Sequence, residues 1–240
     1  MKRTAVLFDL GGVVLGSPLQ AIRVYAQSLG FEANAIHRVV AQTAPSGAWS
    51  RLERGEIALE RFYADFEADC LAARLRIDAR AMMQAMAGSA EPRPIMLSAV
   101  ALLRRAGWRT GALTNNWAHT NSHSDGHDSA APDAAPGAEH DGTRALRGHF
   151  DVFVESSVEG LRKPDPAIYL LACQRLGVSP AQVIFLDDIG ANLKPARALG
   201  MATIKVDEPR AALEALSCLV ELDLLSSDLP SIPPENFPMR

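Results

Sequence analysis

Five short apolar segments, each ending in polar or turn-forming residues, constrain the fold of this chain more than any other feature of its sequence. Most of them lack polar alternation, which is typical of strands covered on both faces of a parallel sheet. The expected strands are Thr4–Phe8, Thr110–Leu113, Val152–Val154, Val183–Leu186 and Ala202–Val206. Helical segments that stop at a glycine separate several of them, namely Pro94–Ala106, Pro166–Leu176 and Asn192–Leu199. This alternation predicts an α/β fold with a doubly wound, parallel, Rossmann-like sheet.

Residues 18–92 have a different pattern, with several helical stretches and no clear strand. One apolar stripe recurs at helical spacing, and we interpret it as core packing; it consists of Leu59, Phe62, Phe66 and Cys70. A helical block directly after the first strand predicts an all-helical cap over the carboxyl edge of the sheet, where ligands bind in such folds. We therefore divide the chain into a core, residues 1–17 and 93–225, and a cap, residues 18–92.

Two segments are expected to lie outside the packed core. Residues 119–143 are low in complexity and hold four of the six histidines, but their spacing matches no metal-ligand motif, so we expect a surface loop. Residues 226–240 carry four prolines and are expected to trail over the surface. The three cysteines lie far apart, and we expect buried, reduced side chains; they are Cys70, Cys173 and Cys218.

Composition and charge narrow the classes of partner. The chain has 240 residues, 48% of them hydrophobic, and a net charge of −4, which is typical of a globular protein and offers no overall attraction for nucleic acid. No uncharged stretch reaches the length of a membrane span, and Asp9 interrupts the apolar run near the amino terminus. We expect a cytoplasmic monomer or homodimer that binds neither nucleic acid nor a membrane.

Polar side chains stand at the ends of three expected strands or just before a helix. Asp9 is followed by Gly11 and Gly12, a turn at which backbone amides can approach an anion. Thr114 and Asn115 follow the second expected strand, and Lys163 precedes a helix. Each of these has an ordinary structural explanation when taken alone, either a turn or a solvated loop lysine.

Asp187 and Asp188 are harder to explain structurally. They come directly after an apolar strand, and burying two like charges together is unfavourable. A hard divalent cation removes this repulsion, and Mg²⁺ commonly uses one or two carboxylates together with phosphate and water. Helix capping accounts for one of these aspartates but not for both.

The order Asp, Thr, Lys and Asp-Asp across successive strand ends resembles the four-motif pattern of the haloacid-dehalogenase-like superfamily. Within it, the chain is similar to the phosphatase domains at the amino termini of soluble epoxide hydrolase and of an acyl-CoA dehydrogenase fusion. The stretches that carry the similarity are Phe185–Arg197, Leu113–Trp117, Gly55–Ile57 and Val154–Pro166.

The resemblance implies a role for each matching residue. Asp9 is expected to be the nucleophile that forms an aspartyl-phosphate. The implied ligands of Mg²⁺ are the Asp9 side chain, the Gly11 carbonyl and Asp188, with Asp187 in direct or indirect contact. Thr114 and Asn115 are expected to fix phosphate oxygens. Lys163 is expected to act in catalysis and phosphate binding by balancing negative charge, in keeping with the electrostatic demands of phosphoryl transfer.

Gly11 departs from the superfamily pattern. Most superfamily phosphatases have an aspartate there, which protonates the leaving group and later activates water. The metal-binding carbonyl is retained, but general acid–base catalysis, typically worth about 10²–10⁴-fold, is lost from this position. A slow or selective enzyme is therefore expected.

Three functions remain open at this point. A Mg²⁺-dependent phosphatase acting on small phosphate monoesters is the leading hypothesis. A non-catalytic phosphate- or metabolite-binding domain is the alternative that Gly11 favours. A metal-free 2-haloacid dehalogenase is disfavoured, because the neighbouring carboxylates would repel one another without a cation.

Substrate choice is expected to reside in the cap. Trp49 and Arg51, close to Arg54, are candidates for facing the entrance of the site. An amphipathic helix with solvated arginines explains the same residues, and we favour that interpretation.

Overall fold

A computed structural model describes residues 2–117 and 145–225 of the chain. The predictions of a surface loop at residues 119–143 and of a trailing tail at residues 226–240 lie outside the described residues.

The core of the structure is one parallel sheet of five strands, as predicted. Its strands are β1 (Ala5–Phe8), β2 (Arg109–Thr114), β3 (Val152–Glu155), β4 (Val183–Asp187) and β5 (Ala202–Lys205). The spatial order is β3-β2-β1-β4-β5, so the chain builds one half of the sheet, returns to the middle and builds the other half. Ligands bind at this kind of switch point, beyond the carboxyl ends of the two central strands β1 and β4.

The register brings the expected polar residues to one edge. Phe8, at the end of β1, pairs with both Ala112 and Leu186, so Asp9 emerges beside the ends of β2 and β4. β1 also alternates between the two faces of the sheet, with Val6 and Phe8 in one hydrophobic cluster and Ala5 and Leu7 in the other. Both clusters consist of buried apolar side chains, which explains why the strands are continuous apolar runs.

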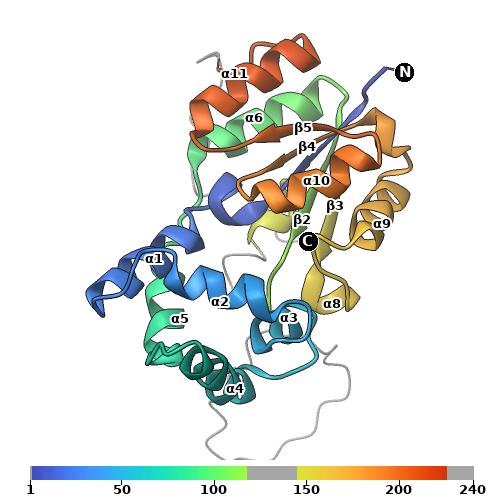
Figure 1. Cartoon of the computed structure of the whole chain (residues 1–240). Helices are drawn as coiled ribbons and strands as arrows, with labels where there is room; N and C mark the ends of the chain where they lie inside the picture. Colours follow the sequence, from blue (N-terminus) through green and yellow to red (C-terminus); the bar gives the residue numbers. More distant parts are fainter. Residues whose placement is uncertain (1, 118–144, 226–240) are drawn as a thin grey trace, which may run out of the picture.

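Helices cover both faces of the sheet (Figure 1). α6 (Pro94–Arg105) and α11 (Pro209–Val220) pack on one face. α9 (Pro166–Leu176) and α10 (Gly190–Ala198) pack on the other. α10 begins at Gly190, two residues before the predicted start. The α/β fold with a doubly wound parallel sheet is thereby confirmed.

The five helices between residues 18 and 87 lie apart from the sheet in Figure 1 and are called the insertion below. They are α1 (Pro18–Ser28), α2 (Ala35–Thr43), α3 (Ala48–Glu53), α4 (Leu59–Ala72) and α5 (Ala79–Ala87). They share a hydrophobic cluster of their own, in which the rings of Phe62 and Phe66 stack at 5.1 Å. The predicted apolar stripe is therefore core packing, with Cys70 fully buried at its end.

The insertion joins the core through two chain segments that run side by side. Gly16 donates its amide to the Glu91 carbonyl at 2.9 Å, and the Arg93 amide donates to the Val14 carbonyl at 2.8 Å. A methyl group at Gly16 would overlap the Ser89 carbonyl, so this close approach of two backbones requires glycine. The two segments form a narrow neck between the insertion and the sheet.

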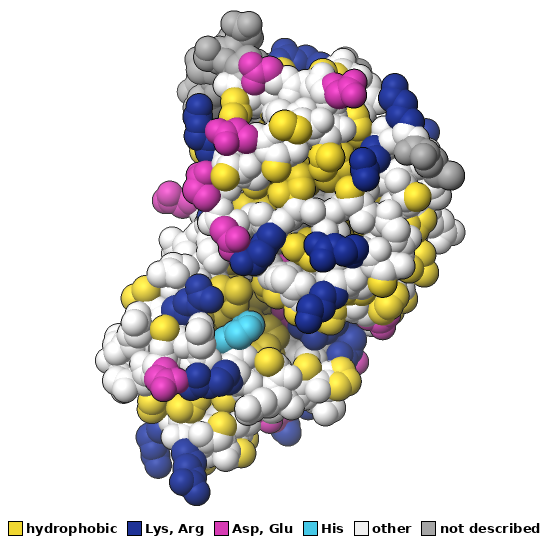
Figure 2. All heavy atoms as spheres, turned by 45° about the horizontal axis from the view of Figure 1, so that its top comes forward, with side chains coloured by type: hydrophobic (Ala, Val, Ile, Leu, Met, Phe, Trp, Pro, Cys, Tyr) yellow, Lys and Arg dark blue, Asp and Glu magenta, His cyan; other side chains and the backbone are white. Residues whose placement is uncertain are grey.

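Two further predictions can be compared with the described surface. Cys70 and Cys173 are buried, but Cys218 is exposed on α11, where the apolar stripe of an amphipathic helix faces away from it, so the prediction of burial is wrong for that residue. Within residues 2–117 and 145–225, no helix combines the length and apolarity needed to cross a bilayer. On the face drawn in Figure 2, basic side chains are interspersed with acidic and apolar ones. The expected absence of nucleic-acid binding remains a prediction.

Candidate active site

A buried lysine joins two of the strand ends. The ammonium group of Lys163 lies 2.8 Å from Asp9 Oδ1 and 2.8 Å from Asp187 Oδ2, and it donates to the Leu113 carbonyl at 2.9 Å. Lys163 is 1% exposed. Burial by itself lowers its pKa, but the carboxylates of Asp187 and Asp9 outweigh burial and raise the pKa above its usual value. Lys163 is therefore a permanent positive charge inside the site.

Asp9, Asp187 and Asp188 form an acidic cluster around this lysine. One oxygen atom from each of the three carboxylates lies within 4.8 Å of the others. Burial raises the pKa of Asp9 well above its usual value, opposed by Lys163 and reinforced by the charges of Asp187 and Asp188. Burial, together with the charge of Asp187, also raises the pKa of Asp188 to about 6. One ammonium group thus faces three carboxylates, and the cluster is short of positive charge.

The donor set fits a hard divalent cation. Among the described residues, Asp188 Oδ1 is buried and accepts no hydrogen bond, which is costly unless another group satisfies it. All candidate ligands are oxygens, the type that Mg²⁺ prefers. Asp9, Asp188 and the Gly11 carbonyl could hold such an ion, with Asp187 held back by its own hydrogen bonds.

Asp187 is oriented by several donors besides Lys163. The Ile189 amide donates to its Oδ1 at 2.8 Å, and the Asn192 side chain donates to both of its oxygens at 3.1 Å. Asn192 lies within the similarity carried by residues 185–197, yet the sequence did not single it out for a role. Asp187 is fully buried, so these bonds fix its carboxylate for Lys163.

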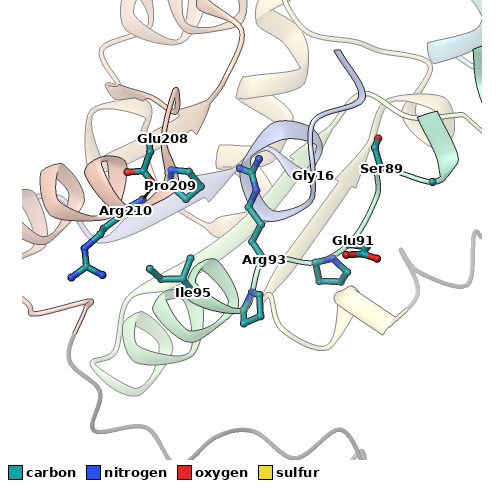
Figure 3. Close-up of a pocket in the computed structure, with 11 residues that line it drawn as sticks. Gly16, Ser89, Glu91, Arg93, Ile95, Glu208, Pro209 and Arg210 are labelled. Carbon is teal, nitrogen blue, oxygen red and sulfur yellow. Dashed lines mark hydrogen bonds between the residues drawn. The ribbon is translucent and has the colours of Figure 1, made fainter. Parts of the chain in front are cut away.

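The turn after Asp9 depends on Gly12 and on an arginine that the sequence did not single out. Leu10–Val14 form an irregular turn that is closed by the bond from the Leu15 amide to the Leu10 carbonyl, and Gly12 in it has a positive φ of 79°. Arg93, at the start of α6, donates to the Gly12 carbonyl at 2.6 Å and to the Val13 carbonyl at 3.2 Å. Figure 3 shows Arg93 extending toward this turn from the wall of a hollow of about 530 Å³ beside the neck. The acidic cluster does not line that hollow.

Gly12→Ala is expected to disturb the acidic cluster. A methyl group at this position would overlap the Asp188 carboxylate, and the left-handed backbone itself disfavours alanine. We expect a loss of about 1–3 kcal/mol in the free energy of unfolding, together with weaker Mg²⁺ binding, measured by urea unfolding and isothermal titration calorimetry. Gly148→Ala is the matched control, since its added methyl group meets no atom within 4 Å. Equal effects of the two substitutions would contradict this account of Gly12.

The side chain of Asn115 holds the Lys163 loop in this structure. Its Oδ1 accepts from the Lys163 amide at 2.9 Å, and its Nδ2 donates to the Lys163 carbonyl at 3.0 Å. Thr114, the last residue of β2, is 4% exposed and its hydroxyl faces the Asn115 carbonyl at 3.5 Å. The chain therefore brings Thr114 and Asn115 to the site. The side-chain carboxamide of Asn115 is hydrogen-bonded to the backbone of Lys163.

The two expected substrate residues lie on α3 and differ in their surroundings. Trp49 is 7% exposed and packs against Phe62, Phe66 and Trp117, with its ring centroid 6.2 Å from that of Trp117. Arg51 is partly exposed and forms an ion pair with Asp65 at 3.3 Å. Trp49 thus connects the insertion with the loop after β2, while Arg51 is occupied within the insertion.

Glu53 and Arg162 were not predicted. Both Nε and Nη2 of Arg162 lie 2.6 Å from Glu53 Oε2, which also accepts from Asn115 Nδ2 at 3.4 Å. Glu53 ends α3 in the insertion, and Arg162 directly precedes Lys163. No sequence signal marks two ordinary charged residues 109 positions apart as partners.

The parallel α/β fold, with an acidic cluster at the carboxyl ends of its central strands, is typical of a hydrolase, and comparison with known proteins gives the family. Residues 4–200 match the model of the haloacid dehalogenase-like hydrolases. The chain therefore belongs to the haloacid dehalogenase-like hydrolase family.

Individual relatives agree with this assignment. A Mus musculus protein, acyl-CoA dehydrogenase family member 10, is 34% identical over 92% of this chain and 19% of its own length. Bifunctional epoxide hydrolase 2 of Sus scrofa is 31% identical over 98% of this chain and 41% of its own length. This chain thus spans less than half of either relative.

A solved structure shares the fold. The haloacid-dehalogenase family enzyme bt-2542 of Bacteroides thetaiotaomicron, in complex with magnesium and inorganic phosphate, superposes with a TM-score of 0.54. The match covers 85% of this chain and 93% of that chain at 16% sequence identity. At this level of identity the likeness concerns the fold.

Proposed function

We propose that this hydrolase is a Mg²⁺-dependent phosphatase of small phosphate monoesters that uses Asp9 as its nucleophile. The observation that carries the proposal is the bridge from Lys163 to Asp9 and Asp187, beside the unpartnered oxygen of Asp188. A buried lysine keeps Asp9 in place, while the remaining negative charge of the cluster calls for a cation.

The proposed reaction places the bond changes at Asp9. One carboxylate oxygen of Asp9 forms a bond to phosphorus as the ester P–O bond breaks, and water then cleaves the resulting acyl phosphate to inorganic phosphate. When bound by Asp9, Asp188 and the Gly11 carbonyl, Mg²⁺ would supply charge neutralisation for the phosphoryl oxygens. Lys163, in contact with Asp9, also neutralises negative charge at the site. The Thr114 hydroxyl and the backbone amide of Asn115 are the groups we assign to phosphate oxygens.

Two comparisons support a phosphoryl substrate. The enzyme bt-2542 was solved with magnesium and inorganic phosphate, which is the combination proposed here. The sequence motifs resemble those of phosphatase domains that precede other enzymes in longer chains. Activities of the remaining parts of those longer relatives are not included in the proposal.

Because position 11 is glycine, no carboxylic acid stands there to protonate the leaving group. A Cβ at Gly11 would lie 3.2 Å from the ring of Pro18, so any side chain there presses on the first residue of α1. We propose that the leaving alcohol takes its proton from water. This requirement favours substrates whose leaving groups are good, such as aryl phosphates.

Restoring the missing carboxylate tests this explanation. We expect the double variant Gly11→Asp/Pro18→Ala to raise kcat for an alkyl phosphate by about 10²-fold, the lower limit for a well-placed acid or base. An aryl phosphate, with its better leaving group, should gain less. Pro18→Ala alone is the control. A double variant that accelerates both esters equally, or neither, would show that proton transfer is not what Gly11 has removed.

The direct test of the proposed function is phosphate release from p-nitrophenyl phosphate with Mg²⁺ and with a chelator. Mg²⁺-dependent release that is absent in Asp9→Asn is expected. Tight Mg²⁺-dependent phosphate binding without turnover over long incubation would instead select the binding domain that Gly11 favours. Chelator-insensitive release of halide from a 2-haloacid would select the dehalogenase. The cytoplasmic location and the state of monomer or homodimer remain proposals that these assays do not address.

A further inference from the structure

A partly buried ion pair joins the insertion to the loop that carries Lys163. The Glu53 side chain is 9% exposed and that of Arg162 is 15% exposed, and they meet at 2.6 Å. Glu53 belongs to α3 of the insertion, whereas Arg162 belongs to the loop between α8 (Ser156–Glu159) and α9. Because both side chains are mostly shielded from water, loss of one partner would leave the charge of the other uncompensated and destabilise this contact.

The same carboxylate reaches the groups that hold Lys163. Glu53 Oε2 accepts from Asn115 Nδ2 at 3.4 Å, and the Asn115 side chain bonds to both the amide and the carbonyl of Lys163. Arg162 directly precedes Lys163 in the chain, so the Lys163 loop is held both by the ion pair and by Asn115, which meet at the same oxygen of Glu53. Lys163 then contacts Asp9.

Two further contacts, one near the start of α3 and one just after its last residue, also reach the core. Gly55 has a φ of 68°, and a methyl group there would overlap the Ser157 carbonyl of α8. Trp49 packs edge-on against Trp117, two residues beyond Asn115. α3 and the residues directly after it therefore contact both the segment after β2, which contains Asn115, and α8, which precedes the Lys163 loop.

We propose that Glu53 is a positioning residue that makes the placement of Lys163 depend on the insertion being seated on the sheet. With the insertion seated, Glu53 holds Arg162 and Asn115, and these hold Lys163 against Asp9. With the insertion displaced about its neck, Arg162 loses its partner and the Lys163 loop is free to move. The consequence for catalysis rests on the proposed phosphatase function, but the coupling itself does not.

Glu53→Gln tests the catalytic consequence. It keeps the size of the side chain and removes the charge, and we expect kcat/KM for p-nitrophenyl phosphate to fall about ten- to hundredfold, since small displacements of catalytic groups have effects of this size. Glu53→Asp should recover part of the loss. In a double-mutant cycle, Glu53→Gln and Arg162→Met together should lower kcat/KM by a much smaller factor than the product of their separate factors. Glu56→Gln is the matched control, because Glu56 lies in an exposed ion pair with Arg54.

A distance measurement tests the coupling without any assay of activity. Spin labels on cysteines introduced at Leu71 in the insertion and Leu170 on the core, both exposed, report the separation of the two parts in a Cys218→Ser background. Pulsed electron paramagnetic resonance should give one narrow distance distribution with Glu53 and a broader, shifted one with Glu53→Gln, while Glu56→Gln stays narrow. Glu53→Asp replaces Glu53→Gln if the latter does not fold.

The outcomes separate this inference from the proposed function. An unchanged distance distribution in the Glu53 variant, or separate effects in the cycle that simply multiply, overturns the inference. A wild-type chain that releases no phosphate overturns the proposed function, and the distance measurement then decides the coupling alone.

Discussion

Asp9→Asn is expected to abolish turnover while leaving the fold intact. Removing an attacking group that has no substitute costs roughly 10⁴–10⁶-fold in kcat in well-studied enzymes, and we expect a loss in this range for p-nitrophenyl phosphate hydrolysis. Asp207→Asn, in an exposed ion pair with Lys205, should keep full activity. Unchanged activity in Asp9→Asn would remove Asp9 from the reaction.

The stability of the same variant separates a chemical role from a structural one. The pKa of Asp9 is raised in the folded chain, mainly by burial, so the folded state binds its proton more tightly than the unfolded state does. Ionised Asp9 therefore lowers the stability of the metal-free protein at neutral pH. We expect Asp9→Asn to melt at the same or a higher temperature than wild type in the presence of a chelator. A lower melting temperature would contradict this charge balance.

Lys163→Met is expected to lower the free energy of unfolding by about 3–5 kcal/mol at neutral pH. The ammonium group is the nearest positive charge to both Asp9 and Asp187, and its removal leaves two buried carboxylates facing each other. Urea unfolding in a chelator measures the effect, and Lys194→Met on the exposed side of α10 should change stability by no more than about 0.5 kcal/mol. Similar losses in both variants would contradict the role of Lys163 in the cluster.

The loss of stability in Lys163→Met is expected to depend on pH. Because burial raises the pKa of Asp9, and that of Asp188 to about 6, both groups take up protons at a higher pH than ordinary aspartates do. Protonation removes the repulsion that Lys163→Met exposes. The difference in stability between wild type and variant should therefore shrink as the pH falls and grow again as it rises.

The sheet was predictable because its strands are buried on both faces. Burial on two faces leaves continuous apolar runs such as Val183–Asp187, and those runs end where the chain leaves the core. Asp9 and Asp187 stand at those ends, and parallel strands bring such ends to one edge. For this reason the sequence predicted the acidic cluster, although it did not predict the distances within it.

Residues that act through the backbone or across long separations could not be predicted. Arg93 binds carbonyl groups, which every residue has, so no motif in the sequence marks its partners. Glu53 and Arg162 are common surface residue types, and only the folded chain removes them from water. Asn115 was expected to bind phosphate. In the structure its side chain bonds to both the backbone amide and the carbonyl of Lys163, because a carboxamide offers one acceptor and one donor at once.

Chemical trapping of the phosphorylated enzyme tests the central claim most directly. Wild-type protein mixed with p-nitrophenyl phosphate and Mg²⁺ is quenched in acid within one turnover, and borohydride then reduces any acyl phosphate before peptide mass spectrometry. We predict that the reduced residue is at position 9 and that the signal is absent in Asp9→Asn. Trapped phosphate on another residue, or turnover without any trapped species in the wild type, would contradict the account.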